Sequence, residues 1–106
     1  MQKICLIHTS VSSKSEASIL AADLMDTRLA ACVQISGPGL SVYRWQGKVE
    51  QTDEYYLNIK TSLACCDDVV TWLQQNHPYE LPEIILTECE ATVAYADWLL
   101  VQTICE

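Results

Sequence analysis

The stretch SVYRWQGKVEQTDEYYLNI, residues 41–59, decides the fold because it predicts a long β-hairpin. Within it, Gln46-Gly47-Lys48 is a glycine-containing turn between two extended runs. In the second run, the odd-numbered residues from Val49 to Ile59 share one face of the strand and the even-numbered residues share the other. The apolar residues gather near Ile59. We therefore expect that end to pack against a core and the end near Val49 to extend past it.

The segments before the hairpin predict a strand, a helix and a second strand. Ile4–Ile7 is a short apolar run, typical of a central strand that is buried on both faces. Between residues 15 and 29, apolar side chains recur with helical spacing, which predicts an amphipathic helix. Cys32–Ile35 restarts an extended pattern. Gly37-Pro38-Gly39 then predicts a bend or bulge in the same edge strand, which resumes over residues 40–45.

The segments after the hairpin predict a helix, a fourth strand and a last helix. Apolar residues return to helical spacing between Ala64 and Asn76, and the prolines of the segment 78–82 stop that helix. Residues 84–87 predict the fourth strand. Residues 95–102 carry the spacing of a last helix that continues to the C-terminus.

This order of elements contains the split βαβ unit of ferredoxin-like folds. We therefore predict an α+β protein, a ferredoxin-like βαββαβ sandwich with an extra C-terminal helix, in a single domain over residues 1–106. The first two helices should cover one face of a four-stranded antiparallel sheet. The other face would carry Ile35, Tyr43, Trp45 and Tyr56, and an open face of this kind usually needs a partner, so association is expected.

Composition and charge exclude several classes of partner. Hydrophobic residues make up 50% of the chain and charged residues 19%, which is enough apolar material for a core. Six Lys and Arg against 14 Asp and Glu give a net charge of −8, which repels the phosphates of nucleic acid and of anionic lipid. We therefore expect neither a nucleic-acid nor a membrane partner. The apolar run Ile4–Ile7 is too short for a signal-peptide core, so a cytoplasmic location is expected.

The cysteines and the catalytic motifs give no sign of an enzyme. No CxxC pair occurs, which removes the usual signature of a zinc ribbon and of a thioredoxin-type redox site. In a reducing cytoplasm we expect most of the six thiols to act as small core residues. GxSxG, HExxH and glycine-rich phosphate loops are missing as well, so we predict that the protein is not an enzyme.

Four segments are specific when they are taken together and in order: LAACV at 29–33, VYRWQGKVE at 42–50, IKT at 59–61 and HPYELPEI at 77–84. With them the chain resembles the CutA divalent-cation-tolerance family nearly from end to end. The resemblance implies a homotrimer built around a three-fold axis, metal ion binding, and a role in tolerance of copper and other divalent cations. The loop at 9–14 and the stretch at 88–92 before the last helix depart from the family pattern.

The trimer implied by the resemblance gives the long hairpin a role. Its tip, with Tyr43 and Trp45, would lie on a neighbouring subunit. This contact would explain why the hairpin extends past the hydrophobic core of its own subunit. Glu50 lies on the same hairpin and is the third predicted interface residue. Around a three-fold axis, Glu50, Asp53 and Glu54 would gather into a site for a hard cation, or they are solvated or paired with basic residues across the hairpin.

Three residues are candidate metal ligands, each with a structural alternative. Cys32 matches the family's cysteine and offers a thiolate suited to copper(I) or zinc, or it is a small residue packed under the first helix. His77 follows a helix whose C-terminal partial charge would raise its proton affinity, or it caps that helix. His8 follows the apolar core of the first strand, near a sheet end, where it binds a ligand or is solvated.

The first functional hypothesis is a CutA-like trimer that binds copper or another divalent cation and contributes to the response to metal ions. The alternative is a regulatory module resembling the PII signalling proteins, with a small ligand bound at clefts between subunits. The acidic balance argues against phosphate-rich ligands for such a module. A third hypothesis is a structural trimer whose effect on metals is indirect.

Overall fold

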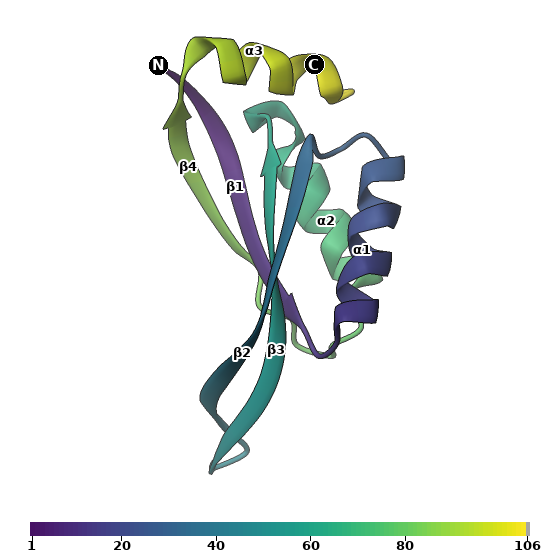
Figure 1. Cartoon of the computed structure of the whole chain (residues 1–106), viewed down its shortest axis with the longest axis vertical. Coiled ribbons are helices and arrows are strands. Elements are labelled where there is room, and N and C mark those ends of the chain that lie inside the picture. Colours follow the sequence, from purple (N-terminus) through teal and green to yellow (C-terminus); the bar gives the residue numbers. More distant parts are fainter. Residues whose placement is uncertain (106) are drawn as a thin grey trace.

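Four antiparallel strands and three α-helices form the fold in the computed structural model, which describes residues 1–105 (Figure 1). The strands lie side by side in the order β2-β3-β1-β4. This arrangement confirms the predicted α+β fold, with its four-stranded antiparallel sheet and its additional C-terminal helix. The elements are β1 (Gln2–Val11), α1 (Lys14–Asp26), β2 (Cys32–Trp45), β3 (Lys48–Thr61), the 3-10 helix η1 (Leu63–Cys65), α2 (Cys66–Asn76), β4 (Ile85–Ala91) and α3 (Val93–Gln102).

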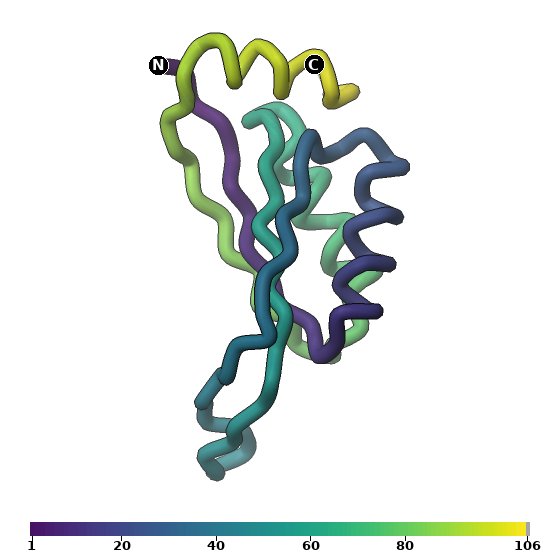
Figure 2. Tube along the Cα trace, in the orientation of Figure 1, coloured from purple at the N-terminus to yellow at the C-terminus, as the bar shows by residue number. Residues whose placement is uncertain are grey.

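The strands β2 and β3 form the predicted hairpin, which is the longest feature of the molecule (Figure 2). Gln46 and Gly47 make the turn, and both have positive φ, 49° and 81°, as tight turns between twisted strands require. The molecule measures 45 × 25 × 21 Å, and the hairpin tip projects beyond the helices along the longest axis. The end of the hairpin near Val49 therefore does extend past the core.

The predicted irregularity at Gly37-Pro38-Gly39 is a β-bulge inside β2. The bulge reverses which residues share a face of the sheet. Before it, Ile35 lies opposite Leu57, which packs against the helices. After it, Tyr43 lies opposite Glu50, on the face that the helices leave uncovered. The prediction for Tyr43 is confirmed, and that for Ile35 is wrong because the bulge changes the alternation between them.

The helices α1 and α2 cover one face of the sheet, as predicted (Figure 1). A second, smaller core lies under α3, which crosses the end of the sheet that holds the N-terminus. None of the helices within residues 1–105 is long and apolar enough to cross a membrane. The main core combines Ile7, Leu57 and Ile59 of the sheet with Leu20 and Leu24 of α1 and Val69 and Leu73 of α2.

Several elements differ in length from their predictions. β1 extends to Val11, because Thr9 and Ser10 continue the ladder with β3 and are buried despite their polarity. β4 extends to Ala91, so residues 88–91, expected as a connection, pair with β1. α1 stops at Asp26, where the Thr27 hydroxyl bonds the Leu24 carbonyl. α3 ends at Gln102, short of the C-terminus.

Two disulfides correct the expectation for the thiols. Cys5 of β1 is bonded to Cys66 of α2, and Cys65 is bonded to Cys105 beyond α3. The partners are 61 and 40 residues apart in sequence, so only the fold brings them together. Cys5, Cys65 and Cys66 are buried, which matches the predicted core role, but they are not free thiols. Among residues 1–105, Cys32 and Cys89 remain unpaired and are half-buried.

Candidate functional site

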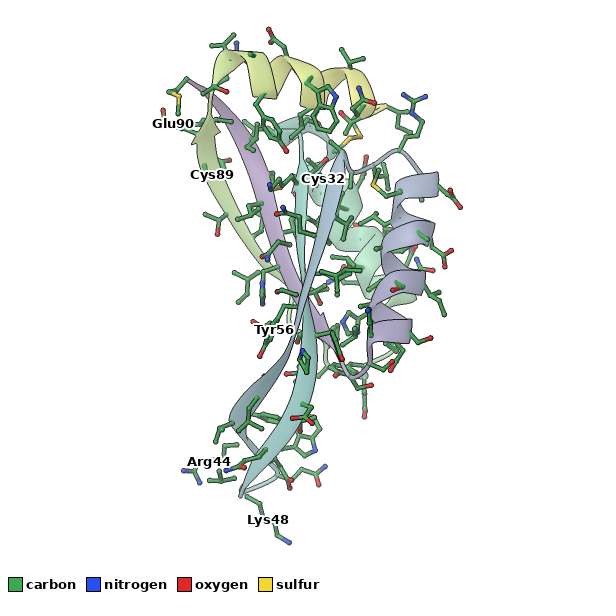
Figure 3. All side chains as sticks on the ribbon, viewed as in Figure 1. Cys32, Arg44, Lys48, Tyr56, Cys89 and Glu90 are labelled. Atoms are coloured by element: carbon green, nitrogen blue, oxygen red, sulfur yellow. A yellow bond between two sulfur atoms is a disulfide. The ribbon has the colours of Figure 1, made fainter. Side chains whose placement is uncertain are left out.

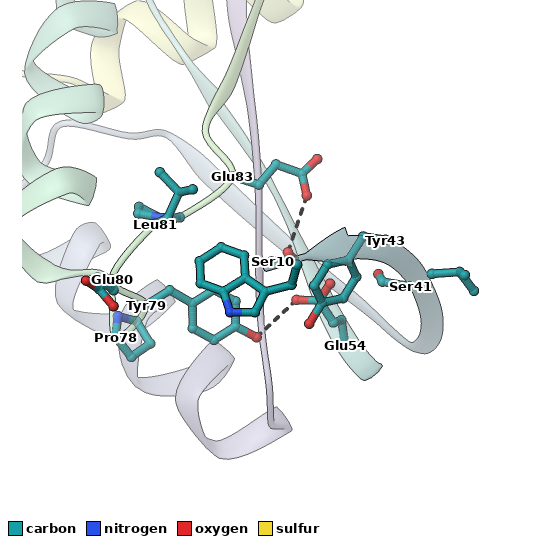
Figure 4. Close-up of a pocket in the computed structure, with 12 residues that line it drawn as sticks. Ser10, Ser41, Tyr43, Glu54, Pro78, Tyr79, Glu80, Leu81 and Glu83 are labelled. Atoms are coloured by element: carbon teal, nitrogen blue, oxygen red, sulfur yellow. Dashed lines mark hydrogen bonds between the residues drawn. The ribbon is translucent and has the colours of Figure 1, made fainter. Parts of the chain in front are cut away.

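The candidate site is a pocket of about 850 Å³ at the place where the hairpin leaves the body of the sheet (Figure 4). We call it the hairpin pocket. One wall comes from residues 41–43 and Trp45 of β2, with Glu54 of β3 and Ser10 of β1 beside them. The other wall is Pro78–Glu83, the segment between α2 and β4. The pocket therefore joins two of the four sequence segments that carry the family resemblance.

His77 holds the second wall in place. Its backbone N–H donates to the Leu73 carbonyl at 2.8 Å and so caps α2, which was the structural alternative for this residue. The imidazole Nε2–H donates to the Ser10 carbonyl at 2.9 Å, and Nδ1 accepts the Tyr79 N–H at 3.0 Å. Both ring nitrogens are thus engaged within the chain.

Burial controls the protonation of His77. Desolvation lowers the pKa of the imidazole below 6.5, and the Ser10 carbonyl, Glu16 and Glu54 oppose this effect only in part. The expectation that the helix end would raise the proton affinity is therefore wrong. The helix terminus acts on His77 through the backbone N–H, while the ring packs into a half-buried position and favours its neutral form.

Tyr79 and Glu54 connect the two walls. The Tyr79 hydroxyl donates to Glu54 Oε2 at 3.0 Å, and Glu54 is only 8% exposed (Figure 4). Burial raises the pKa of Tyr79 far above its ordinary value, and the hydrogen bond to Glu54 adds to the effect. The phenol is thus held in its neutral form and donates a hydrogen bond to the Glu54 carboxylate.

His8 lies within β1, which continues for three more residues to Val11, and it forms the last pair of the ladder between β1 and β4, opposite Ile85. Its Nδ1 shares a hydrogen bond with Asn58 Oδ1 at 3.2 Å, and its Nε2 is 3.7 Å from Glu83 Oε1. The ring stacks on Tyr56 with 5.9 Å between centroids. The other Glu83 oxygen accepts a hydrogen bond from the Ser10 hydroxyl at 3.4 Å, so Glu83 connects His8 to the hairpin pocket.

Cys32 is the first residue of β2 and lies near the α3 end of the sheet, away from the hairpin tip (Figure 3). Its thiol is free and half-buried. The fold of the single chain does not bring Cys32, His77 and His8 together. Within residues 1–105 no group of three or more His, Cys, Asp or Glu side chains is placed to hold a metal ion.

Of the three hairpin carboxylates, Glu50 and Asp53 are exposed, which agrees with the solvated alternative, and Glu54 is not. Arg44 and Lys48 lie at the hairpin tip (Figure 3), and within residues 1–105 neither is within salt-bridge distance of Glu50; the one contact of that kind joins the His8 imidazole and Glu83. Glu50 is exposed, but Glu54 is buried against Tyr79. Tyr43 and Trp45, two of the predicted interface residues, are each 42% exposed.

Sequence reasoning missed the link between Glu54 and Tyr79. The sequence predicts Glu54 only as a solvated, paired or cation-binding carboxylate of the hairpin, and it gives Tyr79 no partner. A signal was present in the segment 77–83, because a glutamate-rich loop held by two prolines is stiff enough to line a site. Its partner on β3 is 25 residues away from Tyr79 and has no local signature.

Comparison with known proteins settles the family. The family model described as CutA1 divalent ion tolerance protein matches residues 5–102. The chain belongs to the CutA1 family. This match confirms the resemblance drawn from the four sequence segments, and it includes both walls of the hairpin pocket.

Individual members of the CutA1 family agree with the match. The divalent-cation tolerance protein CutA of Thermus thermophilus is 41% identical over 101 residues, which cover 93% of this chain and 95% of the relative. The structure of CutA from Synechococcus elongatus superposes with a TM-score of 0.90 at 39% identity, covering 96% of this chain and 91% of the other. CutA1 from Ehrlichia chaffeensis has a TM-score of 0.92 at 26% identity, covering 98% of both chains.

Proposed function

We propose that this CutA1 family member is a homotrimeric metal-binding protein that takes part in the response to divalent cations, with copper as the first candidate. The observation that carries the proposal is the family match over residues 5–102. The net charge of −8 supports it, because an acidic protein raises the local concentration of cations. We propose a binding role rather than a catalytic one. The cytoplasmic location and the lack of nucleic-acid and membrane partners stay predictions.

The exposed hairpin supports the trimer. A two-stranded hairpin is marginally stable on its own in water, and this one projects past the core. Tyr43 and Trp45 are each 42% exposed on it, while Val42 and Val49 are more exposed still. Apolar surface of this kind is covered at an interface. We propose that Tyr43, Trp45 and Glu50 contact a neighbouring subunit.

The isolation of the candidate ligands supports a metal site that a second subunit completes. His8 has Glu83 beside it, so one chain offers an imidazole and a carboxylate there. His77 would have to release the Ser10 carbonyl or the Tyr79 N–H before it could ligate a metal. Cys32 offers a free thiol at a separate place. A trimer can supply the further ligands that copper requires.

The test is a copper titration of matched variants, with occupancy measured by native mass spectrometry. Cys32→Ser should weaken copper binding, whereas Cys89→Ser should not, and the two thiols are matched because both are free and half-buried. His8→Ala should also weaken binding, because it removes an imidazole that has a carboxylate neighbour. Equal loss in the two cysteine variants would show general thiol chemistry in place of a site.

A further inference from the structure

The hairpin pocket contains a buried negative charge that no basic group compensates. Glu54 is 8% exposed, and within residues 1–105 the one hydrogen bond to its carboxylate comes from the neutral Tyr79 hydroxyl. Within residues 1–105 no Lys, Arg or His side chain lies within salt-bridge distance of Glu54, since the one contact of that kind joins His8 and Glu83. A buried carboxylate is costly unless a positive charge or several donors offset the lost hydration. The missing positive charge therefore points to a ligand.

The charge of the residues that line the hairpin pocket indicates the sign of the ligand's charge. Glu80 and Glu83 lie on the same pocket as Glu54, and no Lys, Arg or His is among the lining residues (Figure 4). An anion would meet only carboxylates there, in a chain whose net charge is already −8. The pocket is thus electrostatically suited to a cation and unsuited to phosphates or carboxylates.

The apolar residues that line the hairpin pocket indicate the chemical class of the ligand. Tyr43 and Tyr79 flank the Glu54 carboxylate in Figure 4, and Trp45 belongs to the same lining. Aromatic faces attract ammonium groups and pack against the methyl or methylene groups beside the nitrogen. Val42 and Leu81 add aliphatic surface. A metal ion needs several oxygen or nitrogen ligands instead of such walls.

We propose that the hairpin pocket binds a small organic cation through an alkylammonium group, with Glu54 as the counter-charge and Trp45 and Tyr43 as aromatic walls. The volume of about 850 Å³ falls in the range of pockets that enclose small organic ligands. The proposal goes beyond metal binding and stands on the geometry of one chain. Because Tyr43 and Trp45 are also the proposed contacts between subunits, the ligand would lie at a subunit boundary. The PII-like alternative places a ligand at the same kind of location, but the acidic lining requires a ligand of positive charge.

The experiment is calorimetric titration of the full chain with butyltrimethylammonium and butylammonium, in the presence of a chelator so that metal binding has no influence. Neutral n-butanol is the probe without charge. We expect saturable binding of both ammonium ions. The affinity for n-butanol should be at least about tenfold lower, since the charge provides much of the interaction. The absence of saturable binding for both ammonium ions would overturn the proposal, whatever the outcome for copper.

Matched variants locate the site. Glu54→Gln keeps an oxygen for the Tyr79 hydroxyl but removes the charge, and we expect about tenfold weaker binding of either ammonium ion. Asp23→Asn removes the same charge from an exposed position on α1, outside the pocket and apart from the proposed subunit contacts, and should change affinity by less than about twofold. Equal losses in the two variants would indicate general electrostatic attraction and would contradict the pocket.

A measurement on the unmodified chain keeps the proposal falsifiable if Glu54→Gln does not fold. Bound butyltrimethylammonium should show intermolecular nuclear Overhauser effects between its N-methyl protons and the rings of Trp45 and Tyr43. Their absence from a saturated sample would refute the aromatic walls. A lysine side chain carries the same alkylammonium group, so Nα-acetyl-lysine amide is titrated in parallel. Binding of that probe about tenfold tighter than butylammonium would assign the pocket to a protein ligand and contradict the small cation.

Discussion

At the residue scale, the imidazole of His77 connects the end of α2, the carbonyl of Ser10 on β1 and the backbone of Tyr79. These contacts require the neutral ring with its proton on Nε2, because Nδ1 must accept the Tyr79 N–H. Protonation would place a second N–H at Nδ1 and break that hydrogen bond. The wall of the hairpin pocket is therefore coupled to the protonation state of one histidine.

This coupling predicts a pH-dependent stability. The pKa of His77 is lowered below 6.5 in the folded state, so the unfolded chain binds the proton more readily. Stability from the neutral ring is fully present above about pH 6.5, and it is lost as pH falls from there through the lowered folded pKa. Urea unfolding between about pH 7 and 5 should show this loss in the wild-type chain and a smaller one in His77→Gln. Parallel pH profiles for the two chains would contradict the role of His77.

The Tyr79 hydroxyl is predicted to stabilise the fold because it satisfies a buried carboxylate. Tyr79→Phe leaves Glu54 without its donor and should cost about 1–3 kcal/mol of unfolding free energy. Tyr43→Phe is the matched control, since it removes an exposed hydrogen bond to Thr52 and should cost less than about 0.5 kcal/mol. Urea unfolding of both variants measures the difference. Equal costs would show that Glu54 does not depend on Tyr79.

Some residue-scale features were open to prediction and others were not. The helix-stopping prolines after His77 predict a helix cap or a metal ligand at this residue, and the cap is confirmed. The lowered pKa was not predictable, because it arises from the packing of the ring against β1. The disulfides were missed for the same reason, since Cys65 meets Cys105 only after α2 and α3 have docked.

At the scale of elements, the bulge in β2 determines which side chains line the pocket. It reverses the alternation of the strand, so Tyr43 lies on the uncovered face while Ile35 lies on the helix side. The glycines and proline at 37–39 predicted an irregularity in the strand. They did not predict its effect on the faces, because a bend and a one-residue bulge have the same sequence signature.

The bulge glycine is expected to resist substitution. Gly37 has a φ of 126°, and a Cβ atom there would lie 2.9 Å from the backbone carbonyl oxygen of Glu54. Gly37→Ala should therefore cost about 2–3 kcal/mol or more of unfolding free energy. Gly47→Ala is the control, because its φ of 81° is also positive but open space surrounds it, so about 1 kcal/mol is expected. Thermal or urea unfolding compares them, and a smaller loss at Gly37 would refute the clash.

At the scale of the whole molecule, the projecting hairpin was predictable because its alternation is clear and its apolar residues gather at one end. The hairpin pocket was not predictable to the same degree. Its walls come from β1, the β2–β3 hairpin and the segment 78–83, which are far apart in the sequence. Only the sheet order β2-β3-β1-β4 and the course of the chain after α2 place them together.

The proposed trimer predicts that shortening a side chain of the hairpin, that of Trp45, weakens assembly. Trp45→Ala should loosen the trimer by about 2 kcal/mol or more, because buried aromatic anchors carry much of the energy of an interface. Ile19→Ala is the control, since Ile19 is exposed on α1, the helix that covers the opposite face of the sheet. Sedimentation on dilution should show dissociation of Trp45→Ala at concentrations where Ile19→Ala stays assembled. Equal assembly of the two variants would contradict the interface.

Native mass spectrometry of the unmodified chain, with and without stoichiometric Cu(II), tests the central claim most directly. It reports the number of subunits and the number of bound ions in one spectrum. The proposed function predicts a trimer that takes up a defined number of copper ions. A monomer, or a trimer that binds no copper or a broad range of copper numbers, would contradict the claim that this CutA1 family member is a trimeric metal-binding protein.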